Sequence, residues 1–370
     1  MILTVTLNTA LDLTYRVPRL EVHGSNRVRE ATERPGGKGL NVARVLASLG
    51  HETTVTGFVG GRTGETLRAL LAGEFGAPPL GGTGAGGAGT ARGAGTGQGA
   101  GPAEGAGSAQ GAGTARGAGT ARGAGSAVRI VDALVPIEGS TRRTVGIVDD
   151  AGGDTTQLNE PGPQVSPEEW TAFLGRYAEL LRDPAVQAVA LCGSLPPGVP
   201  VGAYAQLVRE ARGAQVPAVL DTSGEPLRRG IAARPELIKP NAEELAGITG
   251  ITGSTAPLRA ARAAQRRGAG AVAASLGAEG MLLVTRDGTW RAAPPRTLAG
   301  NPTGAGDSAV AGLLSGLVEG LSWPDRLARA VALSAATVRA TGAGEFDART
   351  YADVLPEVAV TEDEEEPAER

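Results

Sequence analysis

The chain has 370 residues, of which 41% are hydrophobic and 20% are charged, and its formal net charge is −4. This balance predicts a folded protein and argues against a strongly basic nucleic-acid-binding or polybasic membrane-surface protein. One cysteine and two histidines are too few for a zinc finger, an iron–sulfur cluster or most histidine-based metal sites. The sequence shows no apolar run of membrane-spanning length and no signal-like N-terminus, so we expect a cytoplasmic protein without nucleic-acid or membrane partners.

Positive charge in this chain comes almost entirely from arginine. Among the 35 basic residues, only Lys38 and Lys239 are lysines, and each lies in a segment rich in Gly, Pro or Asn. A compact ammonium group fits where a planar guanidinium does not. The two lysines are either chance remnants or ligand-contacting residues, and we hypothesise the second.

The first 75 residues predict alternating strands and helices. Residues 1–7 form an apolar run that is typical of a buried strand. Apolar residues at helical spacing follow the glycine-rich turn near residue 37, and Gly50 is a natural helix end. We expect further strands near 13–17, 26–31 and 53–59, and helices over about 40–49 and 63–72.

Residues 76–127 differ from the rest of the chain in composition. The segment is dominated by Gly and Ala, repeats GAGTAR-like hexads and contains almost no large aliphatic residue. It can bury too little apolar surface to offset the entropy of ordering, so we expect a disordered insert. Residues 84–89 match a dinucleotide-binding fingerprint by letter, but neither a strand before them nor a helix after them is predicted, so we discount the match.

After residue 127 the alternation returns and predicts an α/β fold. Ser166 and Glu169 predict a capped helix from Pro167. The other expected strands are 128–137, 144–148, 185–191, 218–221, 236–239, 271–276 and 281–285, and the other expected helices are 201–212, 242–248, 257–267, 304–319 and 324–340. Repeated βα units predict a mostly parallel sheet that helices cover on both faces. The strands near 13–31 and 128–148 lack intervening helices, which predicts a small second sheet.

The strongest functional motif is AGNPTGAGDS in residues 299–308. Gly304, Ala305 and Gly306 are small enough to let a ligand approach the backbone. A helix begins here, and its N–H groups and dipole favour an anion. Asp307 either caps the helix or accepts the proton of a hydroxyl that attacks a phosphoryl group, and the three small residues before it favour the second interpretation.

A second glycine-rich turn, PGGKGLN in residues 35–41, opens another predicted helix. Lys38 and Asn41 lie at its mouth. The segment is not a Walker A loop, because Gly39 rather than Ser or Thr follows the lysine. It is either a plain glycine turn or part of a ligand site.

A third motif, LIKPNAEE in residues 237–244, joins a strand end to a helix. Asn241 and Glu244 are three residues apart and share a helical face. Such a pair suits binding of hydrated Mg²⁺, which keeps much of its water shell. An N-terminal helix cap explains Asn241 equally well, so both interpretations stay open.

Together, the three motifs resemble those of the PfkB (ribokinase-like) carbohydrate kinases. The GAGD of residues 304–307 is similar to the family's C-terminal signature, and the GGKGLNVA of residues 36–43 is similar to its N-terminal one. Further segments resemble the branch of 1-phosphofructokinase, tagatose-6-phosphate kinase and the minor 6-phosphofructokinase, namely 6–12, 26–28, 140–142, 158–163 and 193–198. The resemblance implies a ribokinase-like fold, with a mostly parallel sheet covered on both faces and a small β-sheet lid. It also implies ATP with Mg²⁺ as cofactors, a phosphosugar as substrate and partner, and in many members a homodimer joined through the lids.

The resemblance also implies roles for individual residues. Asp307 resembles the catalytic base, and the residues similar to its anion hole are Gly304, Ala305 and Gly306. The positions that match contacts to the sugar hydroxyls are Asp12, Gly37 and Asn41. The candidates for holding the phosphate already on the substrate are Lys38, Arg27 and Arg142. The nucleotide side is matched by Lys239, Asn241, Ser275, Gly277 and Gly280, and the metal by Asn241 and Glu244.

The implied reaction is transfer of the ATP γ-phosphoryl to a primary hydroxyl of a ketohexose phosphate. D-fructose 1-phosphate, which would give fructose 1,6-bisphosphate, is the first choice, and tagatose 6-phosphate and fructose 6-phosphate are rivals. A non-catalytic sugar-phosphate sensor is the alternative from another class. We expect an α/β core of residues 1–12, 35–75 and 149–358, a lid of 13–34 and 128–148, the insert 76–127 and an acidic tail 359–370.

Overall fold

The computed structural model describes residues 1–75, 129–253, 256–340 and 342–363. The strands of the larger sheet are β1 Ile2–Thr6, β4 Thr53–Val59, β5 Ile130–Asp132, β6 Val135–Pro136, β9 Ala188–Cys192, β10 Ala218–Asp221, β11 Leu237–Ile238, β12 Ala271–Ser275, β13 Met281–Val284, β14 Thr289–Ala292 and β15 Val360–Glu362. Their order is β15-β14-β13-β12-β11-β10-β9-β1-β4-β5, and β6 also pairs with β4. All pairs from β5 to β12 are parallel, whereas β13, β14 and β15 add antiparallel pairs. This is the mostly parallel sheet that the alternation predicts.

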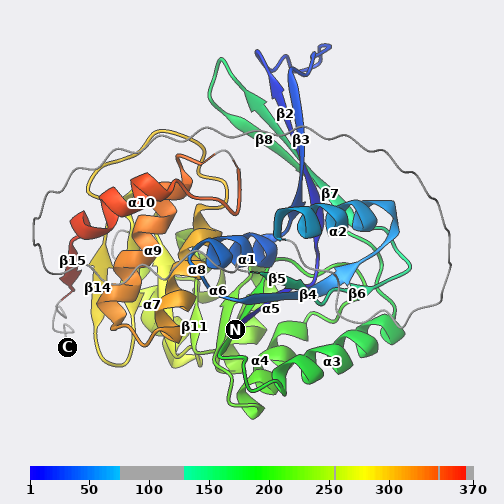
Figure 1. Cartoon of the computed structure of the whole chain (residues 1–370). Helices are drawn as coiled ribbons and strands as arrows, with labels where there is room; N and C mark the ends of the chain where they lie inside the picture. Colours follow the sequence, from blue (N-terminus) through cyan, green and yellow to red (C-terminus); the bar gives the residue numbers. More distant parts are fainter. Residues whose placement is uncertain (76–128, 254–255, 341, 364–370) are drawn as a thin grey trace, which may run out of the picture. The chain divides into compact units, whose positions relative to one another are not determined.

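Helices cover both faces of this sheet. They are α1 Lys38–Ser48, α2 Gly61–Phe75, α3 Pro167–Leu181, α4 Ala203–Gly213, α5 Gly224–Ala232, α6 Ala242–Thr249, α7 Ala256–Arg266, α8 Ala305–Val318, α9 Trp323–Thr337 and α10 Ala348–Val354. Figure 1 shows α3 and α4 on one side of the sheet and α1, α8 and α9 on the other. Within the described residues, no helix combines the length and apolarity needed to cross a membrane.

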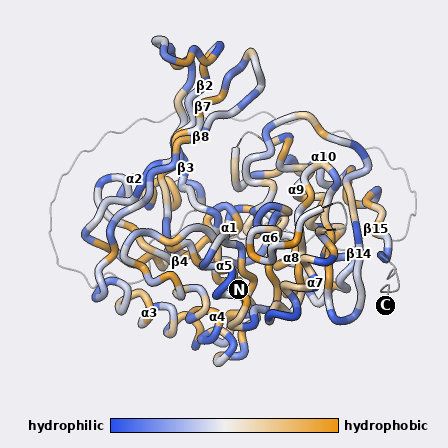
Figure 2. The backbone as a smooth tube through the Cα atoms, turned by 180° about the vertical axis from the view of Figure 1, so that it is seen from behind, coloured by the Kyte–Doolittle hydropathy of each residue, from blue (hydrophilic) through white to orange (hydrophobic). Residues whose placement is uncertain are grey.

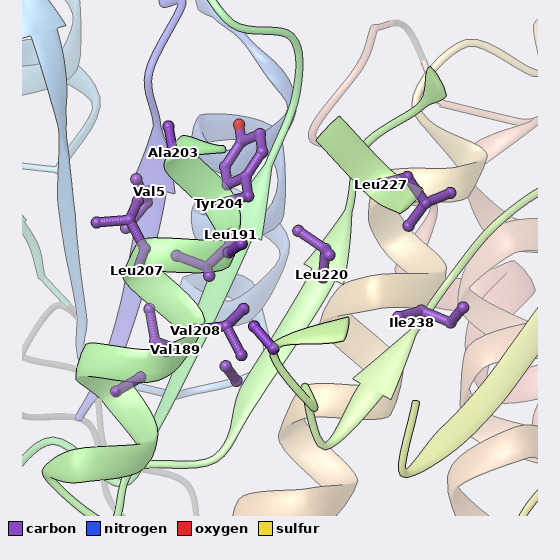
Figure 3. Packing of buried hydrophobic residues seen from close by; sticks show 14 of the residues in the cluster. Val5, Val189, Leu191, Ala203, Tyr204, Leu207, Val208, Leu220, Leu227 and Ile238 are labelled. Carbon is purple, nitrogen blue, oxygen red and sulfur yellow. The ribbon is translucent and has the colours of Figure 1, made fainter. Parts of the chain in front are cut away.

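Alternating strand residues build a separate core on each face. In β9, Val189 and Leu191 pack with α4 residues such as Tyr204, and Figure 3 shows this packing. The intervening Ala188 and Ala190 pack against the helices of the opposite face. Successive side chains of a strand point to opposite faces, so a strand buried on both sides is apolar throughout. Figure 2 shows the corresponding hydrophobic segments among the sheet and its helices.

A second sheet of four strands forms the lid. Its strands are β2 Ala10–Val17, β3 Glu30–Gly36, β7 Arg142–Asp149 and β8 Thr155–Asn159, in the order β3-β2-β7-β8. β2 runs antiparallel to β3 and parallel to β7, and β7 runs antiparallel to β8. The strand expected near 26–31 begins only at Glu30, because its position depends on pairing with β2. Pro35 is tolerated because β3 is an edge strand.

The structure corrects the predicted boundaries of the lid and the tail. Residues 130–136 belong to the main sheet rather than to the lid, since β5 and β6 pair with β4. Conversely, β8 belongs to the lid rather than to the core. The tail predicted from residue 359 contributes β15, which pairs with β14. The insert 76–127 lies outside the described residues, and its disorder stays a prediction.

Several elements agree closely with the sequence. The strands at 53–59 and 218–221 have the predicted bounds. Ser166 and Glu169 form the predicted capping box of α3: the Ser166 hydroxyl accepts from the Glu169 N–H, and the Glu169 carboxylate accepts from the Ser166 N–H. The helices and strands that the sequence did not predict are β8, α5, β14, α10 and β15.

Candidate active site

The carboxyl ends of the parallel strands carry the polar residues of the predicted site. Asp221 ends β10, and Lys239 directly follows β11 on the neighbouring strand. Helices α1 and α8, which contain the two glycine motifs, pack against each other on one face of the sheet. In open α/β sheets, ligands bind outside the carboxyl ends of the strands.

Asp307 and Asn41 join the two glycine motifs. Asp307 lies in the first turn of α8 and is buried, with 7% of its surface exposed. Asn41 in α1 donates from its Nδ2 to Asp307 Oδ2 at 2.8 Å, across 266 residues of chain. The Oδ1 of Asn41 is also buried and has no protein partner in the described part of the chain. Asn41 therefore orients the carboxylate with its amide nitrogen, while its amide oxygen is a buried acceptor without a partner among the described residues.

The start of α8 offers N–H groups to an anion. Gly304 caps the helix with φ +87°, a left-handed conformation that suits glycine. Ala305 donates its N–H to a preceding carbonyl, whereas the N–H groups of Gly306 and Asp307 have no acceptor among the described residues. A Cβ on Gly306 would lie 3.4 Å from the Nζ of Lys239. The candidate anion hole therefore consists of two N–H groups beside an ammonium group. Ala305 does not offer its N–H to an anion, but its small side chain leaves room for a ligand.

The only two lysines of the chain converge on one buried carboxylate. Lys38 Nζ lies 3.2 Å from both carboxylate oxygens of Asp221, and Lys239 Nζ lies 3.6 Å from its Oδ1. The Asp221 side chain is fully buried. We call Lys38, Lys239, Asp221 and Asp307 the charge cluster. The sequence analysis did not predict Asp221. A carboxylate at the end of an apolar strand could have indicated it, because the carboxyl ends of parallel strands form the ligand-binding edge of such a sheet.

The environment shifts the pKa values of the acidic groups. Burial raises the pKa of Asp307 to about 6, against the opposing charge of Lys38. Burial also raises the pKa of Asp12 to about 6, and Arg142 opposes that shift. For Lys38, burial alone would lower the pKa, but the negative charges of Asp221, Asp307 and Glu244 raise it above its ordinary value. Asp307 is thus a carboxylate with the basicity of a proton acceptor near neutral pH.

The lid places Asp12 near this cluster. Asp12 on β2 lines a hollow of about 420 Å³, and its other walls come from the lid strands and from residues in 299–303, 338–340 and 342–343. Arg142 on β7 is close enough to influence Asp12, and it donates hydrogen bonds to the carbonyls of Asn8 and Glu160. Arg27 is exposed and lies beyond the end of the β2–β3 pairing. Within a single copy of the chain it is therefore not placed next to Asp12.

The predicted nucleotide residues line one pocket of about 750 Å³. The predicted residues in its wall are Asn241, Ser275, Gly277, Gly280, Ala305 and Gly306, and apolar surface comes from Leu276, Met281, Val331 and Val338. The apolar wall suits a planar base, and the start of α8 suits phosphate groups. Lys239 lies next to Gly306 at this pocket.

Asn241 and Glu244 form a reciprocal helix cap. Asn241 Oδ1 accepts from the Glu244 N–H at 2.7 Å, and Glu244 Oε2 accepts from the Asn241 N–H at 2.8 Å. The structure thus supports the capping interpretation of Asn241. Glu244 is also near enough to Lys38 to help raise the pKa of that ammonium group.

Comparisons with known proteins agree with this geometry. The model of the pfkB family of carbohydrate kinases matches residues 4–74 and 129–350. The 1-phosphofructokinase of Rhodobacter capsulatus is 36% identical over 338 residues, which cover 90% of each chain. The structure of phosphofructokinase-2 from Escherichia coli in complex with fructose-6-phosphate has a TM-score of 0.75 and 25% identity, and it covers 96% of this chain and 98% of that one.

A more distant structure supports the fold alone. The ribokinase of Arabidopsis thaliana, solved with ribose and ATP, has a TM-score of 0.62 and 19% identity over 96% of this chain and 98% of that one. The predicted ribokinase-like fold is therefore confirmed. By its family match, its relatives and its site, the chain belongs to the pfkB family of carbohydrate kinases, phosphotransferases that use ATP as the phosphoryl donor.

Proposed function

We propose that this chain transfers the γ-phosphoryl group of ATP to a primary hydroxyl of D-fructose 1-phosphate and produces fructose 1,6-bisphosphate. The observation that carries the proposal is the junction of Asn41 and Asp307, where a carboxylate of raised pKa lies beside free N–H groups and two lysines. The similarity to a 1-phosphofructokinase over 90% of both chains supports the choice of substrate.

In this proposal each group has one task. Asp307 accepts the proton of the attacking hydroxyl, and Asn41 keeps the carboxylate oriented toward it. The N–H groups of Gly306 and Asp307, together with Lys239, lie where negative charge develops on the transferring phosphoryl group. Asp12 holds sugar hydroxyls from the lid. Phosphoryl transfer needs mainly positioning and charge stabilisation, so these groups are sufficient.

Mg²⁺ fits this site as a companion of the nucleotide. In the part of the chain that the structure describes, no group of three His, Cys, Asp or Glu side chains could hold a metal ion by itself. Mg²⁺ commonly binds through one or two carboxylates together with substrate phosphates and water. Glu244, whose charge is felt at Lys38, would hold the ion through water. Its chemistry there is neutralisation of phosphate charge.

A homodimer joined through the lids remains part of the proposal. Three large apolar side chains of the lid region are exposed, Val22 by 73%, Val28 by 46% and Leu158 by 57%. Val22 and Val28 lie in the β2–β3 connection and Leu158 lies on β8, and exposed apolar side chains favour contact with another protein surface. Light scattering of the purified protein would measure the oligomeric state.

The test of the proposed function is an assay with ATP and Mg²⁺ against a panel of sugars. We expect the highest kcat/KM with fructose 1-phosphate, lower values with tagatose 6-phosphate and fructose 6-phosphate, and negligible turnover of free fructose, ribose or adenosine. Efficient use of an unphosphorylated sugar would contradict the proposal. Tight binding of a phosphosugar without turnover would favour the sensor alternative.

The raised pKa values of two carboxyl groups predict a steep acid limit of activity. Asp307 and Asp12 both titrate at about pH 6 in the folded protein, and both act in the ionised form. We therefore expect log kcat/KM to fall below about pH 6 with a slope approaching two, or steeper where the substrate phosphate also titrates. In the Asp12→Asn variant, the slope decreases by one. An unchanged slope would show that Asp12 need not be ionised.

Gly36 has no room for a side chain, which gives a test of the position of Asp12. A Cβ at residue 36 would lie 2.1 Å from the Asp12 carboxyl carbon. In the Gly36→Ala variant the carboxylate must move, and we expect kcat/KM for the phosphosugar to fall by about 100-fold. The KM for ATP stays the same. Gly175→Ala is the matched control, because nothing lies within 4 Å of a Cβ there.

A further inference from the structure

Two arginines from different parts of the fold share the carboxylate of Glu345. Arg34 lies on the lid strand β3, and its Nη1 is 2.7 Å from Glu345 Oε1. Arg44 lies on the core helix α1, and its Nη2 is 3.5 Å from the same oxygen. One carboxylate therefore links the lid sheet to a core helix.

Arg44 holds the Glu345 segment from the core side. Its side chain is 5% exposed, and its Nε pairs with Glu74 Oε2 of α2 at 3.2 Å. Its Nη1 donates to the carbonyl of Ala343 at 3.2 Å. Burial lowers the pKa of Arg44, whereas Glu74 and Glu345 oppose that shift. Since a buried cation is costly without partners, these contacts fix residues 343–345 against α1.

The same segment packs against the catalytic groups. Gly344 has φ +78°, and a Cβ there would lie 3.1 Å from both Cα and Oδ1 of Asn41. A Cβ on Gly304 would lie 2.9 Å from the Cα of Ala343. The segment therefore contacts both the residue that orients Asp307 and the cap of α8.

On the lid side, the link reaches the sugar-binding carboxylate. Arg34 is the direct partner of Asp12 in the register of β3 and β2. Arg44 is also near enough to Asp12 to influence its pKa. A displacement of the Arg34 backbone relative to the core therefore carries Asp12 with it.

We propose that Glu345 is a positioning residue, whose pairing with Arg34 holds Asp12 of the lid over the Asn41–Asp307 pair. The inference rests on the proposed function, in which Asp12 holds the acceptor sugar. Arg44 keeps Glu345 in place on the core side, and Arg34 is the group that Glu345 holds on the lid side. Glu345 itself touches neither the sugar nor the phosphoryl group.

A double-mutant cycle tests this link. We expect Glu345→Gln and Arg34→Gln each to raise the KM for the phosphosugar by about fivefold, the upper range for a partly exposed ion pair. Because both variants lose the Arg34–Glu345 pair, the loss in the double variant is smaller than the sum of the two single losses. The KM for ATP does not change. Amide hydrogen exchange in residues 10–17 and 30–36 becomes faster, whereas exchange in residues 2–6 does not.

Arg291→Gln is the matched control. Arg291 Nε forms an ion pair of equal length, 2.7 Å, with Asp363, and the exposures of the two pairs are comparable. We expect this variant to keep the wild-type KM and lid exchange.

Three results would overturn the link. One is an unchanged phosphosugar KM and lid exchange in Glu345→Gln. Another is an additive loss in the double variant, which would indicate that Arg34 contacts the substrate directly. The third is faster exchange throughout the chain, which would indicate a general loss of stability. The exchange comparison needs no turnover, so a wild-type protein inactive on every phosphosugar would refute the proposed function and still test the link. Should Glu345→Gln fail to fold, Arg34→Gln, which leaves Arg44 paired with Glu345, gives the same comparison.

Discussion

The Asp307→Asn variant is expected to lose kcat by about 10³- to 10⁴-fold, in the upper range for removal of a general base. The amide keeps the size of the carboxylate, and its oxygen can still accept from Asn41 Nδ2. The N–H groups at the start of α8 and both lysines are also retained, so binding of ATP persists. Single-turnover kinetics and ATP titration would measure the two effects separately. A near-normal kcat would remove Asp307 as the base.

The same substitution is expected to stabilise the protein at pH 7. The folded state raises the pKa of Asp307 from 3.8 to about 6, so the ionised carboxylate disfavours folding above pH 6. A shift of about two units corresponds to at most about 3 kcal/mol in the free energy of unfolding. The increase in the free energy of unfolding is largest above pH 6 and disappears as the pH falls toward 4. Denaturant unfolding at pH 7 and pH 4 would measure it, and a less stable variant at pH 7 would contradict it.

The Lys239→Arg variant is expected to show the second large loss, about 100-fold in kcat/KM for ATP, comparable to removing one donor to a developing charge. The Lys239 side chain is 5% exposed, and its Nζ lies between Asp221 and the position of a Cβ on Gly306. A guanidinium group is too broad for this space.

Lys38→Arg provides the comparison within the same cluster. The Lys38 side chain is 40% exposed, so a larger head group can turn toward solvent while it stays near Asp221. We expect kcat/KM for ATP to fall by less than about tenfold, because an exposed cation is partly screened by solvent. Equal losses in the two variants would show that space at the start of α8 is not the limiting factor.

Local sequence signals predicted much of the fold. The strands at 53–59 and 218–221 are rich in β-branched and apolar residues and are buried in full, and the α3 capping box needs only two residues in the right spacing. Helix α5 was missed because GEPLRRGIA contains two glycines and a proline, which are poor helix formers. Burial of Leu227 and Ile231 stabilises this helix instead.

Strand partners could not be predicted from local pattern. Residues 130–136 were predicted as a strand, but only pairing decides which sheet they join, and β8 was not predicted at all. The glycine motifs revealed Asp307 and Asn41, because helix starts that bind anions have a recognisable composition. Asp221 and Glu345 were missed, since their roles come from groups far apart in the sequence that meet in space.

The shared carboxylate of Asp221 has a consequence for nucleotide exchange. Two ammonium groups close together in a protein interior repel each other, and Asp221 offsets part of that repulsion. In the proposed function, an arriving triphosphate would meet two lysines whose positive charge Asp221 already offsets in part. Electrostatic attraction therefore adds only modestly to the affinity for phosphate groups. When the diphosphate leaves, Asp221 still pairs with both lysines. The arrangement gives up some affinity and thereby favours rapid release of product.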